Sequence, residues 1–190
     1  NIMALQEYFN ISLEFEEYMK IMSEGTTIWQ KAFKKGFSQK EIETAKNQRN
    51  KYYQNFLRTE NILIPQVKEV LEKLSKRYKM GIVTTSRRVD FEIIHKNLGI
   101  VDYMDFVLCE EDYNYAKPHP EPYLKGLELF KANKEETIVI EDSTRGLTAA
   151  YKAGIECVIV KNEFTITQDF SKASYFIDNL AQLETILNLY

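Results

Sequence analysis

The chain has 190 residues, of which 44% are hydrophobic and 13% aromatic, enough for one good core and a small second unit. The chain contains only 7 Gly and 4 Pro, and this low content excludes a collagen-like or low-complexity chain. The formal net charge of -3 comes from basic and acidic residues that are mixed along the sequence, which excludes the basic footprint of a nucleic-acid-binding protein.

The first 60 residues carry only helical patterns. Apolar residues recur at three- and four-residue spacings and predict helices over 2–9, 13–21, 28–33 and 38–57. The last of these should begin with a capping box, because Ser38 and Glu41 have its spacing. Residues 1–60 are therefore predicted to form an all-helical domain.

From residue 61 onward, short apolar runs alternate with helical patterns. The runs predict strands over 80–83, 105–109, 137–140, 155–160 and 175–177. The segments between and beside them predict helices over 66–74, 89–98, 123–130, 143–153 and 180–189. Strands that alternate with helices are typical of an α/β fold with a doubly wound parallel sheet, so residues 61–190 should form such a core.

Polar side chains follow three of these predicted strands. The first strand ends at Thr84 and Thr85, the loop after the second strand leads to Lys117, and the third strand ends at Glu141 and Asp142. Ligands of open parallel sheets bind beyond the carboxyl ends of the strands, so these side chains should converge. A hydroxyl and an ammonium bind phosphate oxygens, and Mg²⁺ joins one or two carboxylates to a substrate phosphate.

Three sequence motifs at these strand ends resemble those of the haloacid dehalogenase superfamily. "GIVTTS" is similar to the second motif, "KPHPEPY" to the third and "IVIEDSTRGLTAAYKAG" to the fourth. Their order and their separations, 33 residues from Thr84 to Lys117 and 24 more to Glu141, resemble the branch of phosphoglycolate phosphatases and β-phosphoglucomutases. The resemblance covers essentially the whole chain, with residues 1–60 similar to a helical cap domain and 61–190 to the Rossmann-like core.

This resemblance assigns roles to five residues. Thr84 and Thr85 resemble the phosphate-binding pair, and Lys117 resembles the catalytic cation that balances the phosphate and the nucleophile. Asp142 resembles the direct Mg²⁺ ligand, while Glu141 supports the metal directly or through water.

The family's first motif, D-x-D, has no counterpart in the chain. No two of the aspartates are separated by a single residue; they lie at positions 90, 102, 105, 112, 142, 169 and 178. In the family this motif ends a strand that lies between those carrying Thr84 and Asp142, and its first Asp is the nucleophile. We therefore expect a core that lacks its first strand, a catalytic nucleophile in a segment that precedes Asn1, and no activity from the 190 residues alone.

The resemblance implies a magnesium-dependent phosphomonoester hydrolase that acts on a small phosphorylated metabolite through an aspartyl-phosphate. A sugar-phosphate mutase of the β-phosphoglucomutase kind and an inactive protein that binds phosphorylated ligands are the alternatives. Trp29 and the other cap aromatics could pack a core or line a pocket, and Arg87 and Arg88 could bind a second anion or face solvent.

Neither a membrane span nor a disulfide scaffold is expected. No apolar run approaches the ~18 residues of a membrane helix. The two cysteines, Cys109 and Cys157, fall on predicted strands and should be reduced core thiols. We expect a monomer of the cytoplasm without nucleic-acid or membrane partners.

Overall fold

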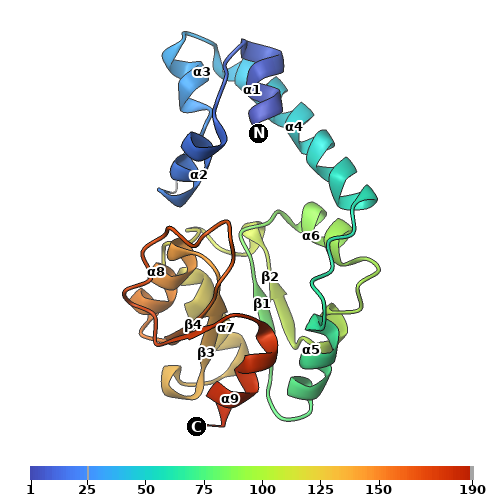
Figure 1. The fold of residues 1–190 in the computed structure, drawn as a ribbon, viewed down its shortest axis with the longest axis vertical. Coiled ribbons are helices and arrows are strands. Elements are labelled where there is room, and N and C mark those ends of the chain that lie inside the picture. Colours follow the sequence, from blue (N-terminus) through green and yellow to red (C-terminus); the bar gives the residue numbers. More distant parts are fainter. Residues whose placement is uncertain (25, 189–190) are drawn as a thin grey trace. The chain divides into compact units, whose positions relative to one another are not determined.

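The computed structural model describes residues 1–24 and 26–188, and the chain divides into two compact units, Asn1–Asn61 and Ile62–Tyr190 (Figure 1). The predicted boundary between residues 60 and 61 lies beside this division. Within the described residues, no helix is both long and apolar enough to cross a membrane.

The first unit is all-helical, with its own apolar core. Its helices are α1 (Ile2–Phe9), α2 (Phe15–Ser23), α3 (Gln30–Lys34) and α4 (Gln39–Thr59). The predicted capping box starts α4: the Glu41 amide donates to the Ser38 hydroxyl, and the Ser38 amide donates to the Glu41 carboxylate. Trp29 is 5% exposed and meets Phe9 edge to face at 6.4 Å, so it packs in the core of this unit.

The second unit contains two groups of parallel strands, in agreement with the predicted fold class. The strands are β1 (Gly81–Val83), β2 (Phe106–Leu108), β3 (Ile138–Glu141), β4 (Glu156–Val160) and β5 (Tyr175–Ile177). Strand β1 pairs with β2, while β4 lies between β3 and β5. Gly81 faces Phe106 across the first pair, where a Cβ atom would lie 2.4 Å from the phenyl ring, so the ring packs directly on the glycine and would have to move for any larger residue.

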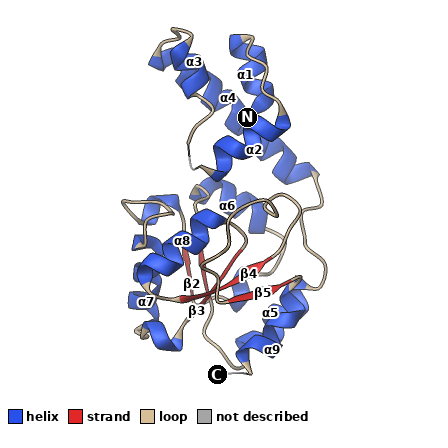
Figure 2. Ribbon diagram, turned by 60° about the vertical axis from the view of Figure 1, so that its left-hand side comes forward, coloured by secondary structure: helices blue, strands red, loops and turns tan. Residues whose placement is uncertain are grey.

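Helices cover both faces of the strands (Figure 2). They are α5 (Val67–Ser75), α6 (Arg88–His95), α7 (Glu121–Phe130), α8 (Thr144–Ala153) and α9 (Leu183–Leu187). Successive side chains of a strand point to opposite faces. Accordingly, Cys157 and Ile159 of β4 pack with residues of α7 and α8, while Val158 packs with residues of α5 and α9. Cys109 and Cys157 are both buried and free, as predicted.

The two strand groups share one helical layer, and among the described residues no strand ladder joins them. Helix α7 contacts β1, β2 and α8, and Val83 of β1 packs against the same cluster as Val139 of β3. In the described part of the chain, sheet pairing joins β1 only to β2 and β3 only to β4. The break between β1 and β3 falls where the first core strand was expected.

Two helices have bounds that differ from those predicted by the sequence. Helix α6 stops at His95 rather than Leu98, and a turn leads from there to Gly99, whose φ of +62° suits a residue without a Cβ. The closing helix begins as a 3₁₀ turn, Leu180–Gln182, because the Asn179 side chain accepts the Ala181 amide, and α9 ends at Leu187. The predicted end at Leu189 lies outside the described residues.

Candidate active site

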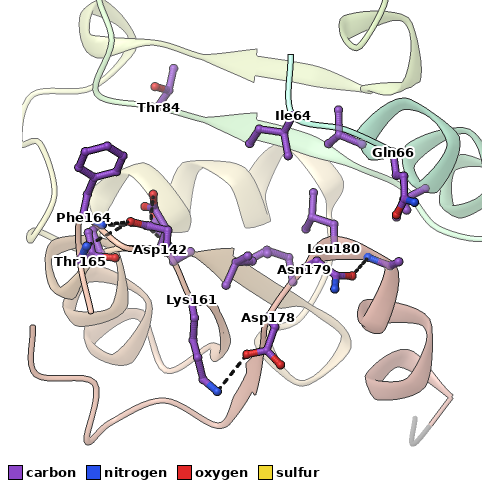
Figure 3. A pocket seen from close by; sticks show the side chains of 18 of the residues that line it. Ile64, Gln66, Thr84, Asp142, Lys161, Phe164, Thr165, Asp178, Asn179 and Leu180 are labelled. Atoms are coloured by element: carbon purple, nitrogen blue, oxygen red, sulfur yellow. Dashed lines mark hydrogen bonds and ion pairs between the residues drawn. The ribbon is translucent and has the colours of Figure 1, made fainter. Parts of the chain in front are cut away.

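The predicted site residues surround one cavity of about 860 Å³ within the second unit. Thr84 and Thr85 follow β1, Asp142 follows β3, and Lys117 reaches the same cavity from the loop before α7. Figure 3 shows Thr84 beside β1 and Asp142 across the cavity. The cavity therefore lies between the two strand groups, at the carboxyl ends of β1 and β3.

Lys117 links the ends of these two strands. Its Nζ atom donates to the Val83 carbonyl oxygen at 2.9 Å and to Glu141 Oε1 at 2.5 Å. The side chains of Lys117 and Glu141 are each only 9% exposed. Arg145, in the first turn of α8, donates from Nη2 to the Lys117 carbonyl at 2.9 Å and so fixes the backbone of the lysine loop.

The Glu141 carboxylate receives further hydrogen bonds on both oxygens. The Tyr123 hydroxyl donates to Oε1, and the Ser143 hydroxyl donates to Oε2 at 3.1 Å. Burial opposes ionisation of Glu141, but the Lys117 ammonium and these hydrogen bonds hold its pKa below the usual value. Burial and the Glu141 charge raise the pKa of Tyr123, so the phenol stays a donor.

Gly146 makes room for this carboxylate at the start of α8. A Cβ atom at position 146 would lie 1.8 Å from Glu141 Cδ and about as close to both oxygens. The Ser143 hydroxyl accepts the Gly146 amide at 3.2 Å and caps the helix. Any side chain at position 146 would displace Glu141 and its partners.

Asp142 lies at the rim of the cavity with an exposed side chain. Asn162 donates from Nδ2 to Asp142 Oδ2 at 3.2 Å. The Asn162 Oδ1 atom accepts the amides of Phe164 and Thr165 at 2.9 and 3.1 Å, so the loop after β4 holds it in place. Partial desolvation of the carboxylate by the cavity wall raises the pKa of Asp142, and the negative charge of Glu141 raises it further.

Thr84 is fixed through its backbone. Its amide donates to the Leu108 carbonyl at 2.9 Å, and its carbonyl accepts the Tyr113 hydroxyl at 2.8 Å. The Thr84 Oγ1 atom accepts the Ser86 amide at 3.1 Å. A threonine hydroxyl is one donor and two acceptor positions, so its O–H can still donate to a ligand.

The basic and imidazole side chains near the motifs have structural partners. Arg87 forms an ion pair with Asp90 at 2.6 Å, and Arg88 pairs with Asp112. His119 accepts the Glu121 amide at 3.2 Å through Nδ1 and so helps to start α7. Within the described residues, none of the three lines the cavity.

Sequence reasoning missed four residues that shape this site: Tyr123, Gly146, Arg145 and Asn162. Tyr123 closes the "KPHPEPY" motif, and Gly146 lies in the first turn after the acidic pair, so their positions carried a signal. Asn162 follows the strand β4 and thus reaches the same edge of the sheet, where polar residues gather. Arg145 had no signal beyond its proximity to Asp142.

Comparisons with known proteins by family model, by sequence and by structure all find similar hydrolases or related phosphoryl-transfer enzymes. Residues 2–160 match the family described as "Haloacid dehalogenase-like hydrolase". The pyrophosphatase PpaX of Bacillus mycoides (strain KBAB4) is 34% identical over 127 residues, which is 64% of this chain but only 58% of that protein. A putative pyrophosphatase PpaX of Caldanaerobacter subterraneus subsp. tengcongensis is 28% identical over 98% of this chain and 84% of its own length. The crystal structure of β-phosphoglucomutase (pgmB) from Clostridium difficile is 25% identical with a TM-score of 0.78, covering 98% of this chain and 87% of that one.

Proposed function

Because this chain belongs to the haloacid dehalogenase-like hydrolase family, we propose that it is the greater part of a magnesium-dependent phosphomonoester hydrolase for a small phosphorylated metabolite. One observation carries the proposal. A nearly buried ammonium, Lys117, bridges the ends of two parallel strands beside the Thr84 hydroxyl and the Asp142 carboxylate. Phosphoryl transfer depends mostly on such positioned charges and donors.

Thr84, Thr85 and Lys117 are proposed to bind the phosphoryl group, with Lys117 and Thr84 as the catalytic pair. An ammonium has three N–H donors, and two of those of Lys117 point to Val83 and Glu141. For the third, no further hydrogen-bond acceptor is found in the part of the chain that the structure describes, although the ammonium also lies over the Tyr123 ring, 4.7 Å from Nζ to the ring centroid. That third donor and the Thr84 O–H can both meet phosphoryl oxygens, which gives charge-assisted hydrogen bonds at a low-dielectric site.

Asp142 is the proposed Mg²⁺ ligand, and the neighbouring Glu141, whose oxygens already accept Lys117, Tyr123 and Ser143, would support the cation through its negative charge. Among the residues that the structure describes, no group of three or more acidic, His or Cys side chains could enclose a metal by itself. This donor set fits Mg²⁺, which commonly takes one or two carboxylates and completes its shell with water and substrate phosphate. When bound, the cation would neutralise charge on the phosphoryl group.

The nucleophile is proposed to come from a strand that fills the space between β1 and β3. That space is open at the strand ends and bordered by Val83 on one side and Ile140 on the other. An aspartate at the end of such a strand would lie between Thr84 and Asp142, beside the Lys117 ammonium. It would attack phosphorus to give an aspartyl-phosphate, which water then hydrolyses. The helical unit Asn1–Asn61 is proposed as the cap domain.

A sugar-phosphate mutase is the second candidate function. The similarity to the pgmB β-phosphoglucomutase favours it, since the same aspartyl-phosphate could return its phosphoryl group to a second sugar hydroxyl. The two activities differ in the acceptor, water or a hydroxyl. Assaying both a phosphate ester and a sugar phosphate, with product analysis, separates them.

The test compares two proteins: the 190 residues alone, and the natural chain with any residues that its gene encodes before Asn1. We expect the natural chain to hydrolyse a generic aryl phosphate only with Mg²⁺, and the 190 residues to show no turnover and low stability. Lys117→Ala should abolish turnover of the natural chain, whereas Lys152→Ala, at an exposed position of α8, is the matched control. Equal turnover by both proteins would refute the assigned nucleophile, and binding of phosphate without any turnover would identify an inactive ligand-binding protein.

A further inference from the structure

The Glu141 carboxylate is fully occupied by groups of its own protein. Oε1 accepts Lys117 Nζ and the Tyr123 hydroxyl, and Oε2 accepts the Ser143 hydroxyl at 3.1 Å and the Asp142 amide at 3.3 Å. A carboxylate offers about four lone-pair positions, so these four donors use its capacity. Glu141 therefore acts inside the protein, as the buried counter-ion of Lys117.

Tyr123 contacts both members of this ion pair. It is 7% exposed on the first turn of α7, and its hydroxyl donates to the same Glu141 oxygen that accepts the lysine. Its ring lies under the ammonium, with 4.7 Å between Lys117 Nζ and the ring centroid. The ring and the hydroxyl thus constrain the lysine in two ways, one direct and one through Glu141.

We infer that Tyr123 is a positioning residue whose hydroxyl holds Glu141 against Lys117 and thereby directs the third N–H of the ammonium toward a bound phosphoryl group. The inference rests on the proposed function, since it assigns Lys117 to phosphate. Without the hydroxyl, Oε1 of Glu141 loses one of its two donors, so the carboxylate can rotate and draw the ammonium with it. The lysine then leaves the orientation in which its third donor meets the ligand.

Tyr123→Phe isolates the hydroxyl because it keeps the ring and its contact with the ammonium. A hydrogen bond to a charged group is stronger than one between neutral groups, so its loss should weaken the binding of inorganic phosphate about tenfold. Binding of Mg²⁺ at Asp142 should stay unchanged, because Asp142 is held by Asn162 and not by Tyr123. A merely structural role would not separate the two affinities in this way.

Calorimetric titration of the natural chain with inorganic phosphate, and separately with Mg²⁺, tests the inference without turnover. Tyr52→Phe is the control, since the Tyr52 hydroxyl also donates to a carboxylate, that of Glu7, but in the first unit. Tyr123→Leu removes ring and hydroxyl together and should weaken phosphate binding further than Tyr123→Phe does.

Weaker phosphate binding by Tyr123→Phe with unchanged Mg²⁺ binding supports the inference. Phosphate binding equal to that of the unaltered protein overturns it, even if Tyr123→Leu binds weakly, because the ring alone would then be responsible. An unaltered protein that binds phosphate but hydrolyses no ester refutes the proposed function and leaves the inference standing. An unaltered protein that binds no phosphate refutes both.

Discussion

Replacing Gly146 by alanine should displace the Glu141 side chain and so destabilise the candidate site. The added Cβ atom would lie 1.8 Å from Glu141 Cδ and 2.0 and 2.2 Å from its two oxygens, all far inside van der Waals contact. Glu141 cannot move away from the added methyl group without breaking its hydrogen bonds to Lys117 and Tyr123, because both of them donate to Oε1. The substitution therefore disrupts a buried ion pair as well as local packing.

The magnitude follows from two opposing effects. Glycine to alanine inside a helix ordinarily stabilises by about 0.5–1 kcal/mol. Overpacking costs about 1–3 kcal/mol, and separating a buried ion pair costs about 3–5 kcal/mol when one charge loses its partner. Since the pair is displaced rather than deleted, we expect a net loss of about 2–4 kcal/mol, or on the order of 10 °C in melting temperature.

Gly126→Ala is the matched control. It makes the same change inside the neighbouring helix α7, but the nearest atom to its added Cβ, Phe106 Cζ, lies at an ordinary contact distance of 3.4 Å. Thermal unfolding followed by circular dichroism should show a large loss for Gly146→Ala and little change or a small gain for Gly126→Ala. Fluorescence of Trp29, the single tryptophan, reports on the core of the first unit and helps to assign the loss. Equal melting temperatures of the two variants would refute the packing of Glu141 against α8.

Three further predictions concern the cation and the alkaline limit of stability. Asp142→Asn should remove most calorimetric Mg²⁺ binding and most metal-dependent activity, because a neutral amide is a poor ligand for a hard cation. Asn162→Ala should weaken Mg²⁺ binding about tenfold while leaving phosphate binding intact, since it removes the group that orients Asp142, and with it the acceptor of the Phe164 and Thr165 amides, but leaves Lys117 and Thr84 in place; equal effects on both ligands would contradict this. Burial raises the pKa of Tyr113 to about 12 from 10.0, so the folded state keeps a proton that the unfolded chain loses, and stability should fall as pH rises from about 10 to about 12. Tyr113→Phe should reduce that fall in urea titrations, and an unchanged slope would count against it.

The order of elements in the second unit could be predicted because each strand is a short apolar run with clear flanks. The Ile138–Glu141 and Glu156–Val160 strands pack on both faces, so their sequences are continuously apolar apart from the glutamate at one end of each. The convergence of Thr84, Lys117 and Asp142 followed from one rule, that the carboxyl ends of parallel strands share an edge. Neither step needed knowledge of side-chain contacts.

The contacts around Glu141 could not be predicted in the same way. The Tyr123 hydroxyl meets a carboxylate 18 positions away in sequence, and the distance depends on how α7 and α8 pack against the strands. The pairing of Arg88 with Asp112, 24 positions apart, is equally non-local. Helix ends were also missed: the pattern of α6 runs to Leu98, but the helix closes at His95 before the turn to Gly99. Such ends depend on turn chemistry rather than on apolar spacing.

The same lysine serves the fold and the proposed chemistry. A buried ion pair stabilises a protein only when its geometry is good and its remaining hydrogen-bonding groups are satisfied. Glu141 meets that condition through Tyr123 and Ser143, while the described residues give Lys117, besides Glu141, only the Val83 carbonyl and the face of the Tyr123 ring. The remaining ammonium donor lies beside the cavity, and its desolvation is offset when an anion enters. A phosphoryl group or a strand-borne carboxylate between β1 and β3 would supply the anion that the third donor of Lys117 lacks. Both should therefore bind more weakly to any variant that lets Lys117 and Glu141 leave their present orientation.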